Sequence, residues 1–217
     1  MMPKISEARR DERRQQILDA GLRCFSRDGF HATTTADIVR EAGVSQGALY
    51  LYFPTKDDIV VALADDRHQG EAFLSALAQR EPDPIRGLAL LVELHGRGLS
   101  DPGRLDARRV GIQGWGEALR NPRIKASVVE GAGRVREAIV GLIERGQRTG
   151  QVRSSVDPQA AAQLLIAVFQ GLVLQVAWGE AVDLAAFGQT LRGMIGEALL
   201  TPAGQASWNE LTATTNR

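Results

Sequence analysis

The sequence predicts an all-α protein, and three observations support that prediction. Apolar residues recur at spacings of three and four along most of the chain, which is the period of a helix buried on one face. Prolines, glycines and Asn or Asp residues separate these stretches at intervals typical of helix ends. Aromatic residues make up only 5% of the 217 residues, while Gly is plentiful, and this composition favours helices over a β-sandwich.

The first expected helix covers residues 9–29 and follows a solvated arm at 1–8. Its apolar stripe includes Ile17 and Phe25, and Gly29 should end it. Arginines crowd its first turns, at positions 9, 10, 13 and 14. Cations at a helix N-terminus oppose the macrodipole, so helix stability does not explain them. Phosphate contact or a solvated charged face remain equally good interpretations.

The stretch 34–56, TTADIVREAGVSQGALYLYFPTK, predicts two short helices and the start of a third. Thr34 can cap the first together with Asp37, and Gly43 can end it in a left-handed conformation. Ser45 can cap the second, and Pro54 ends it because the residue before a proline is pushed out of the α region. Two short helices around a glycine are the minimum for a helix-turn-helix, whose second helix can enter a major groove.

The rest of the chain predicts longer helices in succession. They are expected at 55–80, 85–98, 104–119, 122–148, 158–179 and 183–200, with a mobile tail from about 201. The helix at 104–119 contains three glycines, each costing about 1 kcal/mol relative to alanine, so it either packs closely or deforms. The two last helices are apolar on more than one face, as expected of helices that are core on one side and interface on the other.

Composition limits the function classes. The net charge is zero, which argues against indiscriminate nucleic-acid binding but permits a local basic patch. The single cysteine, Cys24, is expected to be a small buried hydrophobe. The N-terminus lacks the apolar segment of a signal peptide, and we expect no membrane span and a cytoplasmic protein. No metal, cofactor or catalytic motif is recognisable, so we expect a protein that is not an enzyme.

The segment GVSQGALYLYFPTKDDIV, preceded by FHATTTADIVREA, resembles the signature of the TetR family of bacterial transcriptional regulators. The match runs from about Arg13 to Ile59. The resemblance implies a DNA-binding domain at 1–55, ordered from about residue 9, and a helical regulatory and dimerisation domain at 56–217. It also implies a homodimer formed through the last two helices, about 158–200, on a near-palindromic operator of double-stranded DNA.

The resemblance assigns DNA contacts residue by residue. They are expected at Thr34, Thr35, Ser45, Gln46, Gly47, Tyr50, Tyr52 and Lys56. Gln46 and Gly47 should lie nearest the base edges, and glutamine can pair in a bidentate way with adenine. The tyrosines and Lys56 should meet phosphates. Many family members carry Lys or Arg where Gln46 stands, which leaves the preferred base open.

A small-molecule pocket is implied within the later helices. Its candidate lining is His95, Arg109, Gln113, Trp115, Glu117, Phe169 and Trp178. Trp115 with Glu117 would suit a cation, whereas Arg109 would suit a carboxylate, so the ligand's charge stays open. The stretch HGRGL…GIQGWGEALRNP resembles the branch containing the betaine-synthesis repressors, a likeness that does not assign choline.

The expected function is a repressor released from its operator by an unidentified small-molecule ligand. A ligand-independent or activating regulator of the same family is the alternative, and a domain without a cavity would favour it. A helical ligand-binding or catalytic protein with a vestigial helix-turn-helix is a third possibility.

Overall fold

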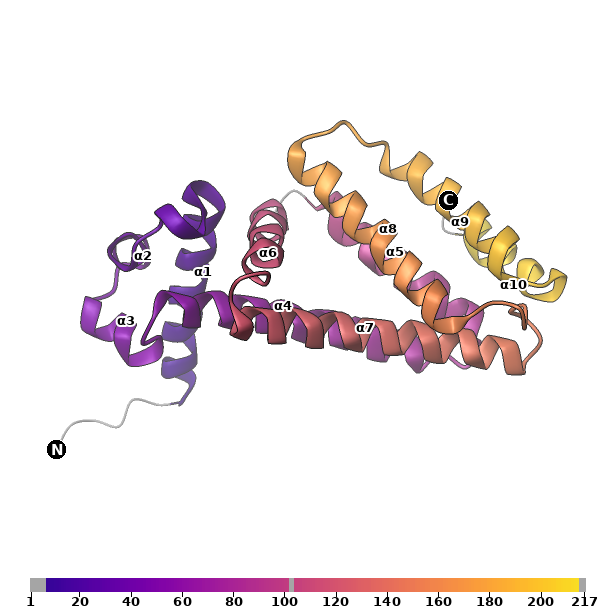
Figure 1. Cartoon of the computed structure of the whole chain (residues 1–217), viewed down its shortest axis with the longest axis horizontal. Helices are drawn as coiled ribbons and strands as arrows, with labels where there is room; N and C mark the ends of the chain where they lie inside the picture. The colour runs from indigo at the N-terminus through magenta and orange to yellow at the C-terminus, as the bar shows by residue number, and fades with distance from the viewer. Residues whose placement is uncertain (1–6, 102–103, 215–217) are drawn as a thin grey trace. The chain divides into compact units, whose positions relative to one another are not determined.

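The structure, a computed structural model, describes residues 7–101 and 104–214, and its named elements there are all α-helices (Figure 1). They are α1 (Glu7–Ala32), α2 (Thr35–Ala42), α3 (Gln46–Tyr52), α4 (Lys56–Gln79), α5 (Pro84–Ser100), α6 (Leu105–Glu117), α7 (Pro122–Arg148), α8 (Pro158–Trp178), α9 (Leu184–Leu199) and α10 (Pro202–Thr214). An isolated antiparallel bridge joins Val152 and Leu200. The all-α prediction is confirmed. Of the arm expected at 1–8, residues 1–6 lie outside the described part, and Glu7 begins α1.

The chain divides into two compact units, and the division does not fall at the predicted boundary of residue 55. The first unit comprises residues 1–68 and 105–129, and the second comprises 69–104 and 130–217. Helix α6 and the start of α7 therefore belong with the helix-turn-helix. The physical reason is that α6 packs along α1, where the Ser26 hydroxyl donates to the Asp106 carboxylate.

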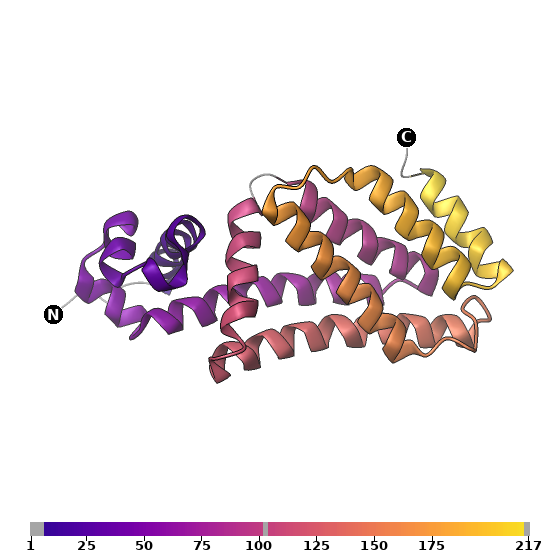
Figure 2. The same ribbon diagram turned by 45° about the horizontal axis from the view of Figure 1, so that its top comes forward.

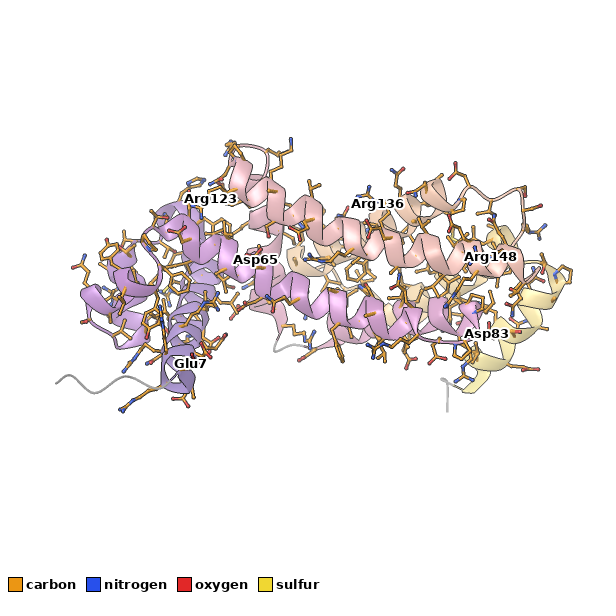
Figure 3. The ribbon with its side chains drawn as sticks, turned by 90° about the horizontal axis from the view of Figure 1, so that it is seen from below. Glu7, Asp65, Asp83, Arg123, Arg136 and Arg148 are labelled. Atoms are coloured by element: carbon orange, nitrogen blue, oxygen red, sulfur yellow. The ribbon has the colours of Figure 1, made fainter. Side chains whose placement is uncertain are left out.

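The first unit is built around the apolar stripe of α1. Ile17 and Phe25 are fully buried together with Ile38 of α2, Leu49 of α3 and Ile59 of α4. Polar links hold α4 to α7 at the edge of this unit. Arg123 donates to Asp58 at 2.6 Å, and Ser127 donates to Asp65 at 2.6 Å; Figure 3 labels Arg123 and Asp65.

The second unit has a core of its own. Its fully buried side chains include Ile85 of α5, Leu142 and Ile143 of α7, and Leu200. Asp83 caps α5 by accepting from the Ile85 amide at 2.9 Å, as expected for an aspartate before Pro at the first helical position.

The prediction of a mobile tail from about residue 201 is wrong for Pro202–Thr214, which form α10. Trp208 is only 2% exposed, and its indole N–H donates to the Arg192 carbonyl of α9 at 3.1 Å. Gln205 donates to the Gly196 carbonyl at 2.9 Å, and Figure 2 shows α9 and α10 side by side. The segment has few apolar residues, so no apolar periodicity predicts a helix there. The burial of Trp208 against α9 holds this helix in place.

Candidate DNA interface and effector site

Caps fix both ends of α2 and the start of α3. The Thr34 hydroxyl accepts from the Asp37 amide at 3.2 Å, and the Asp37 carboxylate accepts from the Thr34 amide at 3.0 Å, which completes the predicted capping box. Gly43 ends α2 at φ 62°, the left-handed conformation expected of it. The Ser45 hydroxyl accepts from the Ala48 amide at 3.1 Å and caps α3. The predicted helix-turn-helix geometry is therefore present.

Helix α3 has one buried side and one open side. Leu49 is fully buried, as predicted, while Gln46, Gly47 and Tyr50 are exposed. Leu51 is 69% exposed, so it does not pack in the core. A carbon added at Gly47 would meet no other atom within 4 Å. The open side therefore carries small and polar groups that can be approached closely from outside.

On this open side, a hydroxyl group of α3 lies close to a hydroxyl group of α2. The hydroxyls of Tyr50 and Thr35 lie 3.4 Å apart. Hydrogen bonds from Thr35 and then from Gln46 lower the pKa of Tyr50 from its ordinary value. The Tyr50 hydroxyl thus lies beside Thr35, which is another residue assigned to DNA contact.

Lys56 is placed differently from the expectation that it points at phosphate. Its ammonium donates to the backbone carbonyls of Phe30 and Thr33, the latter at 2.9 Å. Both carbonyls lie at the end of α1, so Lys56 fills a helix C-terminal site, where a cation is favoured. Two of its three donors are therefore used inside the first unit.

A side chain of α6 also forms hydrogen bonds with the end of α1. Gly29 breaks α1 at φ 82° and ψ 164°, close to where the sequence predicted its end. The Gln113 carboxamide bridges this break: its oxygen accepts from the Phe30 amide at 3.0 Å and its nitrogen donates to the Phe25 carbonyl at 3.0 Å. Sequence reasoning assigned Gln113 to a ligand pocket and missed this role, because only the fold brings α6 to the break.

The arginines at the start of α1 are partly used inside the protein. Arg14 lies 3.8 Å from the Asp66 carboxylate and 5.5 Å from the centre of the Phe53 ring. Arg13 donates to Gln16 at 3.0 Å and is exposed. Of the two interpretations, internal pairing accounts for Arg14 without any phosphate.

The seven residues assigned to a ligand pocket do not form one set in the structure. His95 and Phe169 come together in the second unit, with ring centres 4.9 Å apart and nearly perpendicular. The His95 Nδ1 also lies 2.8 Å from the Leu91 carbonyl. Trp178, in the same unit, is 68% exposed. This pair is the part of the predicted lining that comes together in the second unit, whereas Gln113 and Glu117 line a cavity of the first unit.

The other four lie in the first unit. Glu117 pairs with His31 at 2.9 Å, Trp115 is half-buried, and Arg109 is exposed. Its neighbour Arg108 is the buried arginine, at 8% exposure. Side-chain type alone could not distinguish these two, because the choice depends on which side of α6 faces α1.

Comparison with known proteins places both parts of the chain. Residues 17–63 match the family of bacterial regulatory proteins, tetR family, and residues 98–200 match the BetI-type transcriptional repressor, C-terminal. The HTH-type transcriptional repressor Rv1474c of Mycobacterium tuberculosis is 30% identical over 191 residues, covering 82% of this chain and 90% of the relative. The regulator UidR of Escherichia coli (strain K12) is 25% identical over 188 residues, covering 86% and 92%.

A solved structure agrees over most of the chain. A transcriptional regulator from Saccharomonospora viridis, in complex with choline, is 30% identical with a TM-score of 0.73, covering 88% of this chain and 99% of the other. The matched C-terminal region includes most of the stretch that resembles the betaine-synthesis branch, from residue 98 onward. With its capped helix-turn-helix and helical second unit, this chain belongs to the TetR family and is a DNA-binding transcriptional regulator.

Proposed function

We propose that the protein is a homodimeric repressor whose α3 reads a near-palindromic operator and which a small cationic ligand releases. The observation that carries the DNA-binding part is the open side of α3, whose exposed residues bear no negative charge. Gln46 and Gly47 are placed to meet base edges in a major groove. Thr34, Thr35, Ser45 and Tyr52 lie around them and are assigned to phosphate. Lys56 is left one N–H for that purpose.

The apolar surface of the second unit supports the dimer. Leu164 on α8 is 64% exposed and Met194 on α9 is 62% exposed. Helix α8 is long and apolar enough to cross a membrane by length and composition alone, yet only 22% of its most apolar stretch is buried. Since TetR-family regulators are soluble DNA-binding proteins, an interface with a second copy accounts for this surface better than lipid does. We therefore place the dimer contact on α8 and α9, and the protein in the cytoplasm.

Oligomeric state tests this assignment. Light scattering after gel filtration should give twice the 23.5 kDa of one chain. Leu164→Glu should give a monomer with weakened operator binding, because it places a charge in the contact. Leu119→Glu is the matched control: Leu119 is 87% exposed but lies just after α6, so this variant should stay dimeric. A wild-type monomer at micromolar concentration would overturn the proposal.

The effector assignment rests on the second unit. The choline-bound regulator at 30% identity supports choline as the first ligand to test. A quaternary ammonium is attracted to aromatic ring faces, and the Phe169 ring beside His95 is an aromatic group of this unit that takes part in a defined contact. We assign these two residues to the effector site.

Ligand-dependent release distinguishes the proposal from its alternative. Choline should lower the affinity for operator DNA, and ethanolamine, which lacks the three methyl groups, should do so far less. Phe169→Leu should blunt the response to choline while leaving operator affinity without ligand unchanged. If choline raises affinity, the protein is not a choline-released repressor. If neither choline nor related cations change it, the ligand-independent regulator is favoured.

A further inference from the structure

Leu51 is an exposed apolar side chain on the helix assigned to DNA. Its exposed fraction is 69%, whereas Leu49, two residues before it, is fully buried. The neighbouring Tyr50 is also exposed, but its hydroxyl lies 3.4 Å from the Thr35 hydroxyl. Leu51 has no polar atom with which to make such a contact. Exposure of a single leucine is common on protein surfaces, so its position on α3 has to show what this side chain can meet.

Leu51 lies on the outermost side of α3. Leu49 faces the core, and two residues turn an α-helix by about 200°. Gly47 and Leu51, two residues before and after Leu49, therefore both point away from the core and lie one turn apart on the same face. A carbon added at Gly47 would meet no other atom within 4 Å, so no other segment covers this face there. Leu51 thus belongs to the surface that Gly47 opens to close approach.

The chemistry of the major groove limits what Leu51 can bind on this surface. A leucine carries neither a charge nor a hydrogen-bond donor, so it gains nothing from a phosphate oxygen. The apolar group that distinguishes one base pair from another in the major groove is the C5-methyl group of thymine. Contact between the leucine and this methyl removes apolar surface of both groups from water, which is favourable.

We propose that Leu51 contacts a thymine methyl group in each half-site of the operator, and is therefore a further specificity-determining residue of α3. This inference rests on the proposed DNA-reading function and deepens it. Gln46 would read hydrogen-bonding groups of a base, while Leu51 would read an apolar group one turn further along the helix from Gly47.

Removing the methyl group from the DNA tests the contact directly. Each thymine of the preferred site is replaced in turn by deoxyuridine, which lacks only the methyl group and pairs with adenine in the same way. Wild-type affinity, measured by fluorescence anisotropy, should fall at one thymine position, about fourfold for one half-site and about 15-fold for both. Leu51→Ala should bind the thymine operator less tightly than wild type. It should be insensitive to this replacement, because the side chain that meets the methyl is missing.

Leu119→Ala is the matched control, because Leu119 is an exposed leucine of the same unit that lies outside α3. It should respond to deoxyuridine as wild type does. The salt dependence of binding should be the same for Leu51→Ala and wild type, since a leucine neutralises no phosphate. Thermal melts check that both variants are folded.

A wild-type protein that is indifferent to every deoxyuridine replacement in its preferred site overturns the proposal. So does a Leu51→Ala protein that still loses affinity when the same thymine is replaced. In both cases the sequence-specific regulator still stands. A folded wild-type dimer that prefers no DNA sequence overturns the proposed function and this inference together.

Discussion

Gly47 lies in the first turn of α3, where a glycine is unfavourable for the free protein. Glycine in a helix costs about 0.5–1 kcal/mol relative to alanine. A carbon added at this position meets nothing within 4 Å, so no neighbour in the chain requires a glycine. In this account the glycine allows DNA to approach α3 closely from outside.

Gly47→Ala should therefore change stability and binding in opposite directions. The free energy of unfolding should rise by about 0.5–1 kcal/mol, a shift of about 2–4 °C per kcal/mol in the melting temperature of a chain this long. The added methyl enters the contact with the base edges, and overfilling a close-packed contact costs about 1–3 kcal/mol. Operator affinity should then fall about five- to 150-fold.

The assay pairs thermal melts with anisotropy titrations on the selected operator and on a shuffled duplex. Gly133→Ala on α7 is the control, because a carbon there also meets nothing within 4 Å but lies in the second unit. It should gain similar stability without losing affinity. A stabilised Gly47→Ala protein that binds the operator as tightly as wild type would refute the reasoning about close approach.

Three further predictions concern the first unit. Lys56→Met keeps the apolar stem but removes the ammonium that donates to the two carbonyls at the end of α1. The free energy of unfolding, measured by urea denaturation, should therefore fall by about 1–3 kcal/mol. Unchanged stability with lost DNA affinity would instead favour a phosphate role. Gln113→Leu should speed hydrogen exchange of the Phe30 amide, and an unaltered rate would contradict the bridge across the break in α1. Hydrogen bonds from the Thr34 side chain and amide and from Arg40 lower the pKa of Asp37 from 3.8 to about 2. The stabilisation of the folded state that results is complete above pH 3.8 and is lost as the pH falls through about 2. In the Thr34→Ala variant, an NMR titration should find the pKa of Asp37 closer to 3.8.

Local features were predictable from the sequence because neighbouring residues determine them. The capping box of Thr34 and Asp37, the left-handed Gly43 and the inward Leu49 each depend on a few adjacent positions. The order of the helices follows from apolar periodicity and from breaks at proline and glycine. The residues that carry the family resemblance also lie close together in the sequence, from about Arg13 to Ile59.

Features that depend on packing between distant segments were not predictable. Lys56 meets carbonyls 26 and 23 residues earlier in the chain, and Gln113 meets groups more than 80 residues away. No local pattern reports such distances, so Lys56 was assigned to DNA phosphate and Gln113 to a ligand pocket. Trp208 shows the same limit, because its burial against α9 turns an unpatterned segment into α10.

Selection of bound sequences from a random DNA pool by the purified protein tests the central claim most directly. The account predicts a near-palindromic site whose half-sites lie about 34–36 Å apart, or a multiple of that distance, as two copies of α3 in a dimer require. Recovery of no preferred sequence by a folded, dimeric protein, with and without choline, would contradict it.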